Sequence, residues 1–358
     1  MRRGRYACRL FEPVPRSPVL QPRRVTLKDV AREAGVSTGT VSMVLNDSPR
    51  IAAATREHVR EVMRTLGYVY DRSAGNLRNR TKSRIVGVSI CDLVNPYYAD
   101  VLAGIQETVD KLGRVPVLGN CAESVPRQLR FLETLREYNV EGLIVTPVIG
   151  TPKADLQQVV DWRLPVVQVT RLVTGVDTDY VGINNRMSAQ IAVAHLAALG
   201  HQRIAYIGHT RRTTTGRDRL AGFNAGLKAA RLVADAELFA ESHVTREGGA
   251  QAVAQLFGHR RRPTALVCFN DVIAFGAMLG LRQLGLEPGR DCAVVGLDNV
   301  TEAALWKPAL TSVAVDADRI GQEAGRLLMR RLESPDLPTE RVVLDPHLVV
   351  RESCGSAR

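Results

Sequence analysis

The sequence predicts an all-α helix-turn-helix headpiece followed by a larger α/β body built on parallel sheets. Between residues 26 and 66 the apolar residues recur at helical spacing, whereas after Ser83 short apolar strands alternate with amphipathic helices. The chain has 358 residues, which is too long for one hydrophobic core and enough for two or three domains. The change of pattern therefore predicts a domain boundary near Ser83.

The composition is that of an ordinary soluble globular protein, with 45% apolar and 24% charged residues. No apolar run reaches the roughly eighteen residues that a membrane-spanning helix needs. Residues 1–24 are rich in Arg and Pro and lack the apolar stretch of a secretory signal, so the cytoplasm is the expected compartment. The six cysteines are scattered without a CxxC pair, which predicts free buried thiols and no metal site.

The net charge of +11 is concentrated at the N-terminus. Residues 1–84 hold 18 Arg and Lys against 7 Asp and Glu, and the rest of the chain holds 30 of each kind. A basic head on a neutral body is typical of a protein that binds a polyanion, because each phosphate contact releases condensed counterions. Residues 1–23 are expected to be a disordered basic extension.

Each headpiece helix has start and stop signals. The first helix is expected to begin at Thr26, which can cap it, and to carry Asp29 in its first turn. Gly35 can adopt the left-handed conformation that ends this helix and starts a tight turn. Ser37 is the expected cap of a second helix, which completes a helix-turn-helix. A third helix, ending at Gly67, closes a small core.

The second helix leaves one face of small and polar side chains outside the core. Such groups suit the major groove of DNA and its phosphates. They are Thr38, Gly39, Ser42, Met43 and Asn46. Residues 35–39 also match GxSxG, the nucleophile elbow of serine hydrolases, but that motif needs a strand before the serine and here the preceding residues have helical period. A hydrolase that uses Ser37 is therefore a disfavoured alternative.

The segment VTLKDVAREAGVSTGTVSMVLNDSP, followed by TRE and LGY, resembles the headpiece of the lactose-repressor family of bacterial transcription regulators. The resemblance covers about residues 24–352. It implies a DNA-binding domain at 24–69, a hinge at 70–83, and an effector-binding and dimerisation domain at 84–352. Two positions depart from the family pattern: Tyr70 replaces a frequent proline and Ala52 replaces a serine cap.

The resemblance also implies how the hinge works. The hinge is too short to hold a helix alone, and it is expected to fold only when two subunits bind DNA together, with Ala74 in the minor groove and Leu77 between base pairs. The implied DNA-binding residues are Thr26, Ser37, Thr38, Gly39, Thr40, Ser42, Met43, Asn46, Arg50, Thr55, Tyr68, Ala74 and Leu77. Three base-reading positions lack the long polar side chains of well-known relatives, so the operator sequence is not carried over.

In the body, strands that alternate with helices predict parallel sheets covered by helices. The predicted strands are 85–90, 115–118, 142–146, 166–169, 203–208, 265–269 and 293–296. Neither GxGxxG after a first strand nor GxxxxGK[ST] is present, so a nucleotide-binding enzyme lacks its phosphate loop and no cofactor is expected. The body resembles the two-lobed periplasmic-binding-protein fold. This resemblance implies lobe one at about 84–184 and 314–341, and lobe two at about 185–313 and 342–352.

Polar side chains follow several predicted strands, and parallel sheets bind ligands beyond the carboxyl ends of their strands. An Asp with Arg and Asn can hold adjacent sugar hydroxyls by paired hydrogen bonds. The effector-binding residues that the resemblance implies are Tyr97, Thr170, Thr215, Arg219, His243, Asn270 and Asp298. His243 stands where relatives usually have an aromatic. Because Arg171 and Arg219 lie nearby, an anionic sugar acid or sugar phosphate is an alternative to a neutral sugar.

These observations predict a sequence-specific DNA-binding regulator, a repressor of metabolic genes whose operator affinity is changed by a sugar or sugar derivative. We expect a homodimer on a palindromic operator, associated with the nucleoid when bound; a tetramer is an alternative, but no heptad repeat follows Arg351. A small-molecule-binding protein without gene control is the runner-up. His195, His201 and His209 have no partner pattern of a catalytic triad or metal set, so no enzyme is expected.

Overall fold

The computed structural model describes residues 25–45, 47–68, 83–208 and 213–355. The chain divides into two compact units with the boundary between residues 80 and 81, here called the headpiece and the body. No helix in the described ranges is long and apolar enough to cross a membrane. The hinge positions Ala74 and Leu77 and the extension at 1–23 lie outside the described residues, as does Asn46.

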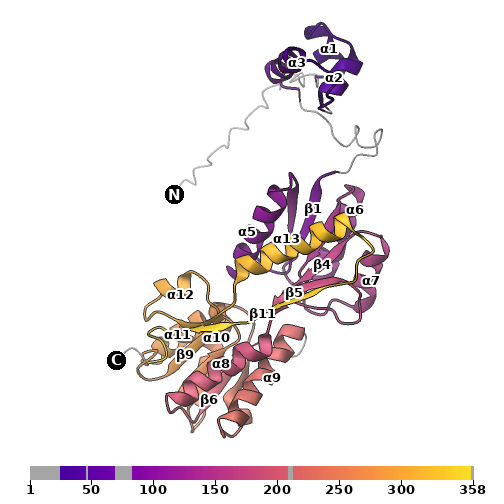
Figure 1. The fold of residues 1–358 in the computed structure, drawn as a ribbon. Helices are drawn as coiled ribbons and strands as arrows, with labels where there is room; N and C mark the ends of the chain where they lie inside the picture. The colour runs from indigo at the N-terminus through magenta and orange to yellow at the C-terminus, as the bar shows by residue number, and fades with distance from the viewer. Residues whose placement is uncertain (1–24, 46, 69–82, 209–212, 356–358) are drawn as a thin grey trace, which may run out of the picture. The chain divides into compact units, whose positions relative to one another are not determined.

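The headpiece is a bundle of three helices around a small valine-rich core (Figure 1). Its helices are α1 (Leu27–Glu33), α2 (Thr38–Leu45) and α3 (Ala53–Leu66). Val30, Val41, Val44 and Val59 are buried between them, each on the face that its helical spacing predicts.

The ends of the headpiece helices follow the predicted signals. Thr26 and Asp29 form a capping box on α1, with Thr26 N donating to Asp29 Oδ2 at 2.9 Å. Gly35 and Gly67 both adopt φ +64°, the left-handed conformation that stops α1 and α3. Ser37 Oγ accepts from Thr40 N at 3.0 Å and so caps α2. The helix-turn-helix is thus fixed by local side-chain to backbone bonds.

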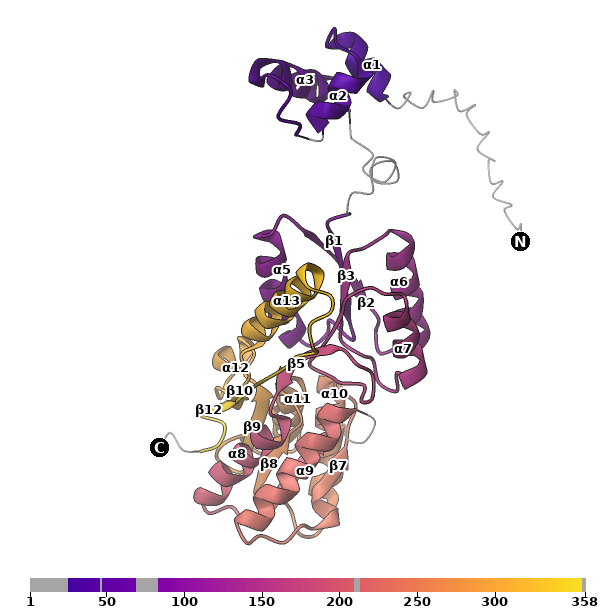
Figure 2. The same cartoon turned by 45° about the vertical axis from the view of Figure 1, so that its right-hand side comes forward.

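The first lobe of the body is a parallel six-stranded sheet in the order β11-β5-β4-β3-β1-β2. Its strands are β1 (Ile85–Ile90), β2 (Val115–Asn120), β3 (Gly142–Val145), β4 (Val166–Val169), β5 (Asp179–Ile183) and β11 (Arg341–Leu344). The helices that cover it are α5 (Tyr97–Asp110), α6 (Val125–Glu137), α7 (Lys153–Asp161) and α13 (Ala317–Glu333). The pair α5 and α13 covers one face, and α6 and α7 cover the other (Figure 2).

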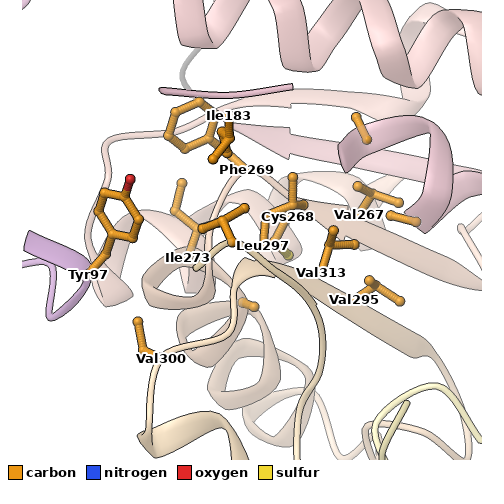
Figure 3. Close-up of a cluster of buried hydrophobic side chains, with 14 of the residues drawn as sticks. Tyr97, Ile183, Val267, Cys268, Phe269, Ile273, Val295, Leu297, Val300 and Val313 are labelled. Carbon is orange, nitrogen blue, oxygen red and sulfur yellow. The ribbon is translucent and has the colours of Figure 1, made fainter. Parts of the chain in front are cut away.

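The second lobe repeats this plan in the order β12-β10-β9-β8-β6-β7, with only β12 antiparallel to its neighbour. Its strands are β6 (Ile204–Gly208), β7 (Phe239–Glu241), β8 (Ala265–Cys268), β9 (Ala293–Asp298), β10 (Thr311–Ala314) and β12 (His347–Val349). Its helices are α8 (Asn185–Ala198), α9 (Thr214–Ala229), the short 3-10 helix η1 (Ala236–Leu238), α10 (Arg246–Gly258), α11 (Asp271–Gln283) and α12 (Glu302–Leu305). The cluster of buried apolar side chains in this lobe includes Phe269 and extends to Tyr97 of lobe one (Figure 3).

The chain passes between the lobes three times, from β5 to α8, from β10 to α13 and from β11 to β12. The last passage corrects one predicted boundary. Residues 342–352 were assigned to lobe two, but β11 pairs with β5 in the first sheet as far as Leu344. The return to lobe two therefore lies three residues later than predicted, because an edge strand with alternating exposure gives no continuous apolar signal.

The cysteines described by the structure have no chemical partner of their own kind. Cys91, Cys121, Cys268, Cys292 and Cys354 are all buried and form no disulfide bond, as the sequence predicts. Burial raises the pKa of Cys292 to about 12, and the same cause raises that of Cys91. Such thiols remain protonated and unreactive at neutral pH.

Candidate functional site

The headpiece presents the outer face of α2 to solvent. Thr38, Gly39 and Met43 are exposed there, and Ser42 is partly buried beside them. The helix carries no charged residue along its whole length, so it adds no repulsion toward an anion. Its amino-terminal end, capped by Ser37, carries the partial positive charge that attracts phosphates. Small polar groups on an uncharged helix form a surface that can enter a DNA groove.

The other predicted DNA-binding residues of the headpiece surround this face. Arg50 is exposed in the turn before α3, and Thr55 and Tyr68 are partly buried at the two ends of α3. Thr26 and Thr40 also act locally, in the capping bonds of α1 and α2. The structure thus shows Thr26 and Thr40 as parts of helix caps. For all five residues, contact with DNA stays a prediction.

The GxSxG pattern at residues 35–39 is no nucleophile elbow. The serine of that motif follows a strand, whereas Ser37 follows the helix α1 and a left-handed turn at Gly35. Its hydroxyl bonds to Thr40 N and, at 2.9 Å, to Thr40 Oγ1. Ser37 thus acts as a helix cap, as the helical period of the preceding residues indicates.

A cavity of about 250 Å³, here called the central cavity, lies between the two lobes of the body. All seven predicted effector residues line it, although they come from distant parts of the chain. Lobe one contributes Tyr97 and Thr170, and the remaining five come from lobe two. Figure 3 shows Tyr97 and Phe269 at the edge of the cluster of buried apolar side chains. The carboxyl ends of parallel strands therefore meet here, as expected for this sheet type.

Arg219 is the most constrained polar group of the cavity. Its Nη2 lies 3.0 Å from Asp298 Oδ1, its Nε donates to Asn185 Oδ1 at 2.9 Å, and its Nη1 donates to the carbonyl of Phe269. The guanidinium carbon also lies 4.7 Å from the centre of the Phe269 ring. A planar donor held at each of these points is oriented before any ligand arrives.

Asp298 is almost completely buried, and its environment pulls its pKa in two directions. Burial raises the pKa above its usual value, and the charge of Arg219 and the amide of Asn95 oppose that rise, so the net shift is upward. One carboxylate oxygen faces Arg219 and the other accepts from Asn95 Nδ2 at 3.3 Å. The Arg219–Asp298–Asn95 network is a set of donors and acceptors suited to adjacent hydroxyl groups.

Three hydrogen bonds in or near the cavity connect the lobes. Asn95 of lobe one reaches Asp298 of lobe two, as given above. Thr215 Oγ1 donates to the carbonyl of Thr170 at 3.2 Å, and Leu172 N donates to Thr214 Oγ1 at 3.1 Å. A molecule that binds in the cavity competes with or reinforces these bonds. A ligand that contacts these groups differently in two lobe arrangements would favour one of the two.

Three non-glycine residues of the cavity wall, Glu123, Thr170 and Asp298, have left-handed backbones. Thr170 adopts φ +64° and Asp298 adopts φ +114°, a region that costs free energy for residues with a Cβ. Thr170 is held by Tyr97, whose hydroxyl lies 3.1 Å from Thr170 Oγ1, and by Tyr180, which donates to its carbonyl. The strain aims the side chains of Thr170 and Asp298 away from their strands and is typical of a functional site.

Both arginines of the central cavity are already paired with carboxylates. Arg171 binds Glu123 in a bidentate pair, with Nη2 to Oε1 at 2.8 Å and Nη1 to Oε2 at 3.0 Å. Burial alone would raise the pKa of Glu123, but the bonds and charge of Arg171 and the amide of Ile149 lower it overall. With Asp92 also in the wall, the described carboxylates outnumber the guanidinium groups. Because both guanidinium groups already have a carboxylate partner, the cavity wall favours the neutral sugar over the anionic alternative.

Several lining residues escaped prediction from the sequence. Asn95 lies in the loop between β1 and α5, and Phe269 directly follows β8. The rule that parallel strands end at ligand sites could have found both. Phe269 adds an aromatic ring to the cavity wall, in addition to the predicted His243. Asn270 lines the cavity and also caps α11, because its Oδ1 accepts from Ile273 N at 3.0 Å.

Asp271 does not line the cavity but lies behind its wall, where it follows the lining residue Asn270. It is fully buried, and it accepts from Ser312 Oγ at 2.6 Å and from Val300 N at 2.8 Å. Burial, together with the nearby charge of Asp298, raises the pKa of Asp271 well above its usual value. Within the described ranges, no three His, Cys, Asp or Glu side chains are arranged to hold a metal ion.

Comparison with known proteins agrees with this architecture. Residues 26–71 match the family model of bacterial regulatory proteins of the lacI family, and residues 193–354 match that of the periplasmic binding protein-like domain. The transcriptional repressor PurR of Mannheimia succiniciproducens is 31% identical, over 92% of this chain and 98% of that protein.

Two solved structures are similar over nearly the whole chain. The lac repressor dimer bound to operator and the anti-inducer ONPF superposes with a TM-score of 0.81 at 28% identity, covering 93% of this chain and 99% of the other. The complex of the transcriptional regulator CelR with cellobiose gives a TM-score of 0.70 at 30% identity, covering 92% and 100%. The likeness therefore includes both the headpiece and the body.

Proposed function

Because this chain belongs to the lacI family of bacterial regulatory proteins, we propose that it represses transcription from a palindromic operator. We also propose that a neutral sugar or related polyol, bound in the central cavity, sets the affinity of the protein for that DNA. Like its relatives, the chain is a DNA-binding transcriptional regulator and not an enzyme. The palindrome, the class of ligand and the individual contact residues are the parts that the proposal adds.

The Arg219–Asp298–Asn95 network is the observation on which the ligand class depends. It offers oriented donors and acceptors inside a cavity whose two guanidinium groups are already paired with carboxylates. A neutral ligand with neighbouring hydroxyls can exchange hydrogen bonds with such a network without leaving a charge unpaired. The cellobiose bound to the similar regulator CelR is a molecule of this class.

An exposed edge strand supports the homodimer that a palindromic operator requires. The strand β2 is the last in its sheet and leaves Val115 60% exposed and Val117 38% exposed. An unpaired edge with apolar side chains is a surface that proteins normally cover. We propose that a second subunit covers it, which would present two α2 helices to successive major grooves.

The DNA part of the proposal is tested by selecting duplexes from a random pool with the full chain and measuring binding by fluorescence anisotropy at fixed salt. Met43→Glu places a negative charge on the exposed face of α2, and we expect it to weaken the selected duplex at least about tenfold. Thr65→Glu makes the same change on an exposed position of α3 and is expected to bind within about twofold of the parent chain. Equal losses in both variants would contradict the assignment of α2.

The ligand part is tested by adding ribose, galactose and cellobiose to the same assay. A sugar that binds the central cavity is expected to change operator affinity by about 5-fold to 150-fold, and the experiment decides the sign. Asn95→Ala removes the bond to Asp298 across the lobes and is expected to reduce this change, whereas Asn224→Ala, on an exposed part of α9, leaves it intact. Binding of a sugar with no effect on DNA affinity would favour a small-molecule-binding protein without gene control.

A further inference from the structure

Residues 47–51, between α2 and α3, form a turn that is here called the connecting turn. It carries Arg50, which is exposed and is one of the residues expected to contact DNA. The connecting turn contains no helix or strand, and Asp47 at its start adopts φ +50°, a left-handed backbone that costs free energy for a residue with a Cβ. A turn of this kind keeps one shape only where other groups hold it.

Arg56 of α3 holds the connecting turn by two backbone carbonyls. Its Nη2 donates to the carbonyl of Ser48 at 2.9 Å and to the carbonyl of Ile51 at 3.2 Å. The Ser48 carbonyl also accepts from Ile51 N at 3.3 Å, so all three bonds close the same loop. One charged nitrogen thus bridges both sides of the segment that contains Arg50, and hydrogen bonds with a charged donor are stronger than neutral ones.

The rest of the Arg56 guanidinium indicates that these two bonds fix its position. The Nε atom is buried and has no hydrogen-bond partner among the described residues. A buried donor without a partner is unfavourable, so the side chain would turn this nitrogen to solvent unless other contacts held it. The bonds to the connecting turn are the contacts that hold it.

The position of Arg56 in the sequence is unfavourable for α3 itself. The helix begins at Ala53, its cap residue Ala52 makes no side-chain bond, and its first turn holds no acidic residue. Arg56 brings a positive charge close to the helix end that already carries a partial positive charge. Helix stability therefore gives no reason for an arginine here, whereas its bonds to the connecting turn do.

A second arginine of α3 also reaches the connecting turn, but through a weaker contact. Arg60 Nη2 lies 2.7 Å from Asp47 Oδ1, and both side chains are largely in solvent. Water and salt screen such a pair, so it adds little to the order of the turn. Of these two arginines, Arg56 is the one whose bonds reach the backbone on both sides of Arg50.

From these contacts we infer that Arg56 is a positioning residue for DNA binding, which fixes the connecting turn so that the exposed guanidinium of Arg50 can bind a phosphate. Arg56 acts through Arg50 and adds no phosphate contact of its own. Without its bonds the connecting turn would adopt other shapes, and binding DNA would then cost the entropy of ordering it. The inference rests on the proposed function, because it takes Arg50 as a DNA contact.

A double-mutant cycle in the full chain tests this role. Arg50→Ala, Arg56→Met and the double variant are titrated with the selected duplex at several salt concentrations. We expect each single variant to weaken binding about fivefold and to lower the slope of log affinity against log salt by about one, because each loses the same phosphate contact. We expect the double variant to lose no more than Arg50→Ala does, because the two residues act as one unit.

Arg64→Met is the matched control. It removes an exposed guanidinium from the same helix, where Arg64 pairs with Glu57 and Glu61, and it is expected to bind within about twofold of the parent chain. Circular dichroism checks that the headpiece of each variant is folded. If Arg56→Met unfolds it, Arg56→Gln, which keeps a side-chain donor, takes its place in the cycle.

A second measurement needs no DNA. The Ile51 amide bonds to the Ser48 carbonyl inside the connecting turn, and its hydrogen exchange reports whether the turn keeps its shape. We expect this exchange to be faster in Arg56→Met than in the parent chain and unchanged in Arg64→Met. The same exchange rate in Arg56→Met and in the parent chain would overturn the inference.

Two results of the cycle would also overturn it. Full affinity in Arg56→Met would show that the connecting turn does not need this side chain. Losses that multiply in the double variant, with a further fall in the salt slope, would make Arg56 a phosphate ligand itself. A parent chain that selects no duplex would contradict the proposed function and with it the role of Arg56, whereas a failed cycle in a chain that binds would contradict only the role of Arg56.

Discussion

Ion pairs of nearly equal geometry have opposite surroundings in the headpiece and in the central cavity. In the headpiece Arg60 Nη2 lies 2.7 Å from Asp47 Oδ1, with 47% and 74% of the two side chains exposed. In the cavity Arg219 Nη2 lies 3.0 Å from Asp298 Oδ1, with 5% and 4% exposed. The distance is almost the same, so the difference in energetic weight comes from the water that screens the first pair and is excluded from the second.

This contrast indicates how the two parts of the protein hold their shapes. The headpiece relies on capping bonds and a small apolar core, and both side chains of the ion pairs on α3 remain largely in solvent. The body places a few charges where each must keep its partner, because an unpaired buried charge is strongly unfavourable. Changes to polar residues should therefore have large effects in the cavity and small effects in the headpiece.

The largest effect is expected from removing one partner of the buried pair. Asp298→Ala leaves the Arg219 guanidinium buried without its carboxylate, which should reduce the free energy of unfolding of the body by about 3–5 kcal/mol. Asp47→Ala, the matched change in the exposed headpiece pair, should cost less than about 1 kcal/mol. Urea unfolding of the full chain, followed by circular dichroism, measures both, and similar losses would remove the contrast.

A second effect distinguishes the two parts by pH. The folded body holds a proton on Asp271 at pH values where the unfolded chain has lost it, because burial raises the pKa of this carboxyl in the fold. The stability from this group is complete below the unfolded pKa and is lost as pH rises through the folded pKa. Asp271→Asn keeps the shape without the titration and should make the body's Tm less dependent on pH.

Differential scanning calorimetry between pH 5 and pH 8 checks this prediction. Asp298 also has a raised pKa, so part of the slope should remain in Asp271→Asn. Two outcomes would show that the Asp271 carboxyl is ionised in the fold. One is the same slope of Tm against pH in Asp271→Asn and in the parent chain. The other is a Tm of the body that rises across this range in the parent chain but not in Asp271→Asn.

The smallest effect is expected in the headpiece cap. Ser37→Ala removes the acceptor for Thr40 N and should lower the stability of the headpiece by about 1 kcal/mol, with no change in the body. Thr65→Ala, which removes an exposed hydroxyl from α3, is the control and should be close to neutral. Hydrolysis of a nitrophenyl ester by the parent chain that disappears in Ser37→Ala would instead revive the hydrolase alternative.

Local signals explain why much of the fold could be predicted from the sequence. The caps at Thr26 and Ser37 and the glycine at 35 act within a few residues of the helices that they bound. The strands 85–90 and 166–169 are rich in Val and Ile, with one polar residue each, and both have the predicted bounds. The strands β5, β7, β10, β11 and β12 were missed, because they are short, contain polar residues or lie at edges.

The site residues could be predicted as a set but not as a network. Strand ends and the family resemblance gave the seven residues that the structure brings around the central cavity. Their partners lie far away in sequence: Asn95 meets Asp298 across 203 positions, and Arg171 meets Glu123 across 48. No local pattern encodes such pairs, so the sequence alone left both a neutral and an anionic ligand open.

The three chain passages between the lobes have a consequence for how specificity can evolve. Two rigid bodies joined by three short connections have few ways to move, so different ligands in the cleft can produce only variants of one opening motion. The connections then determine how the lobes move, and the cavity walls determine which ligand binds. New specificities can therefore arise by replacing wall side chains such as His243 while the mechanical response is inherited unchanged.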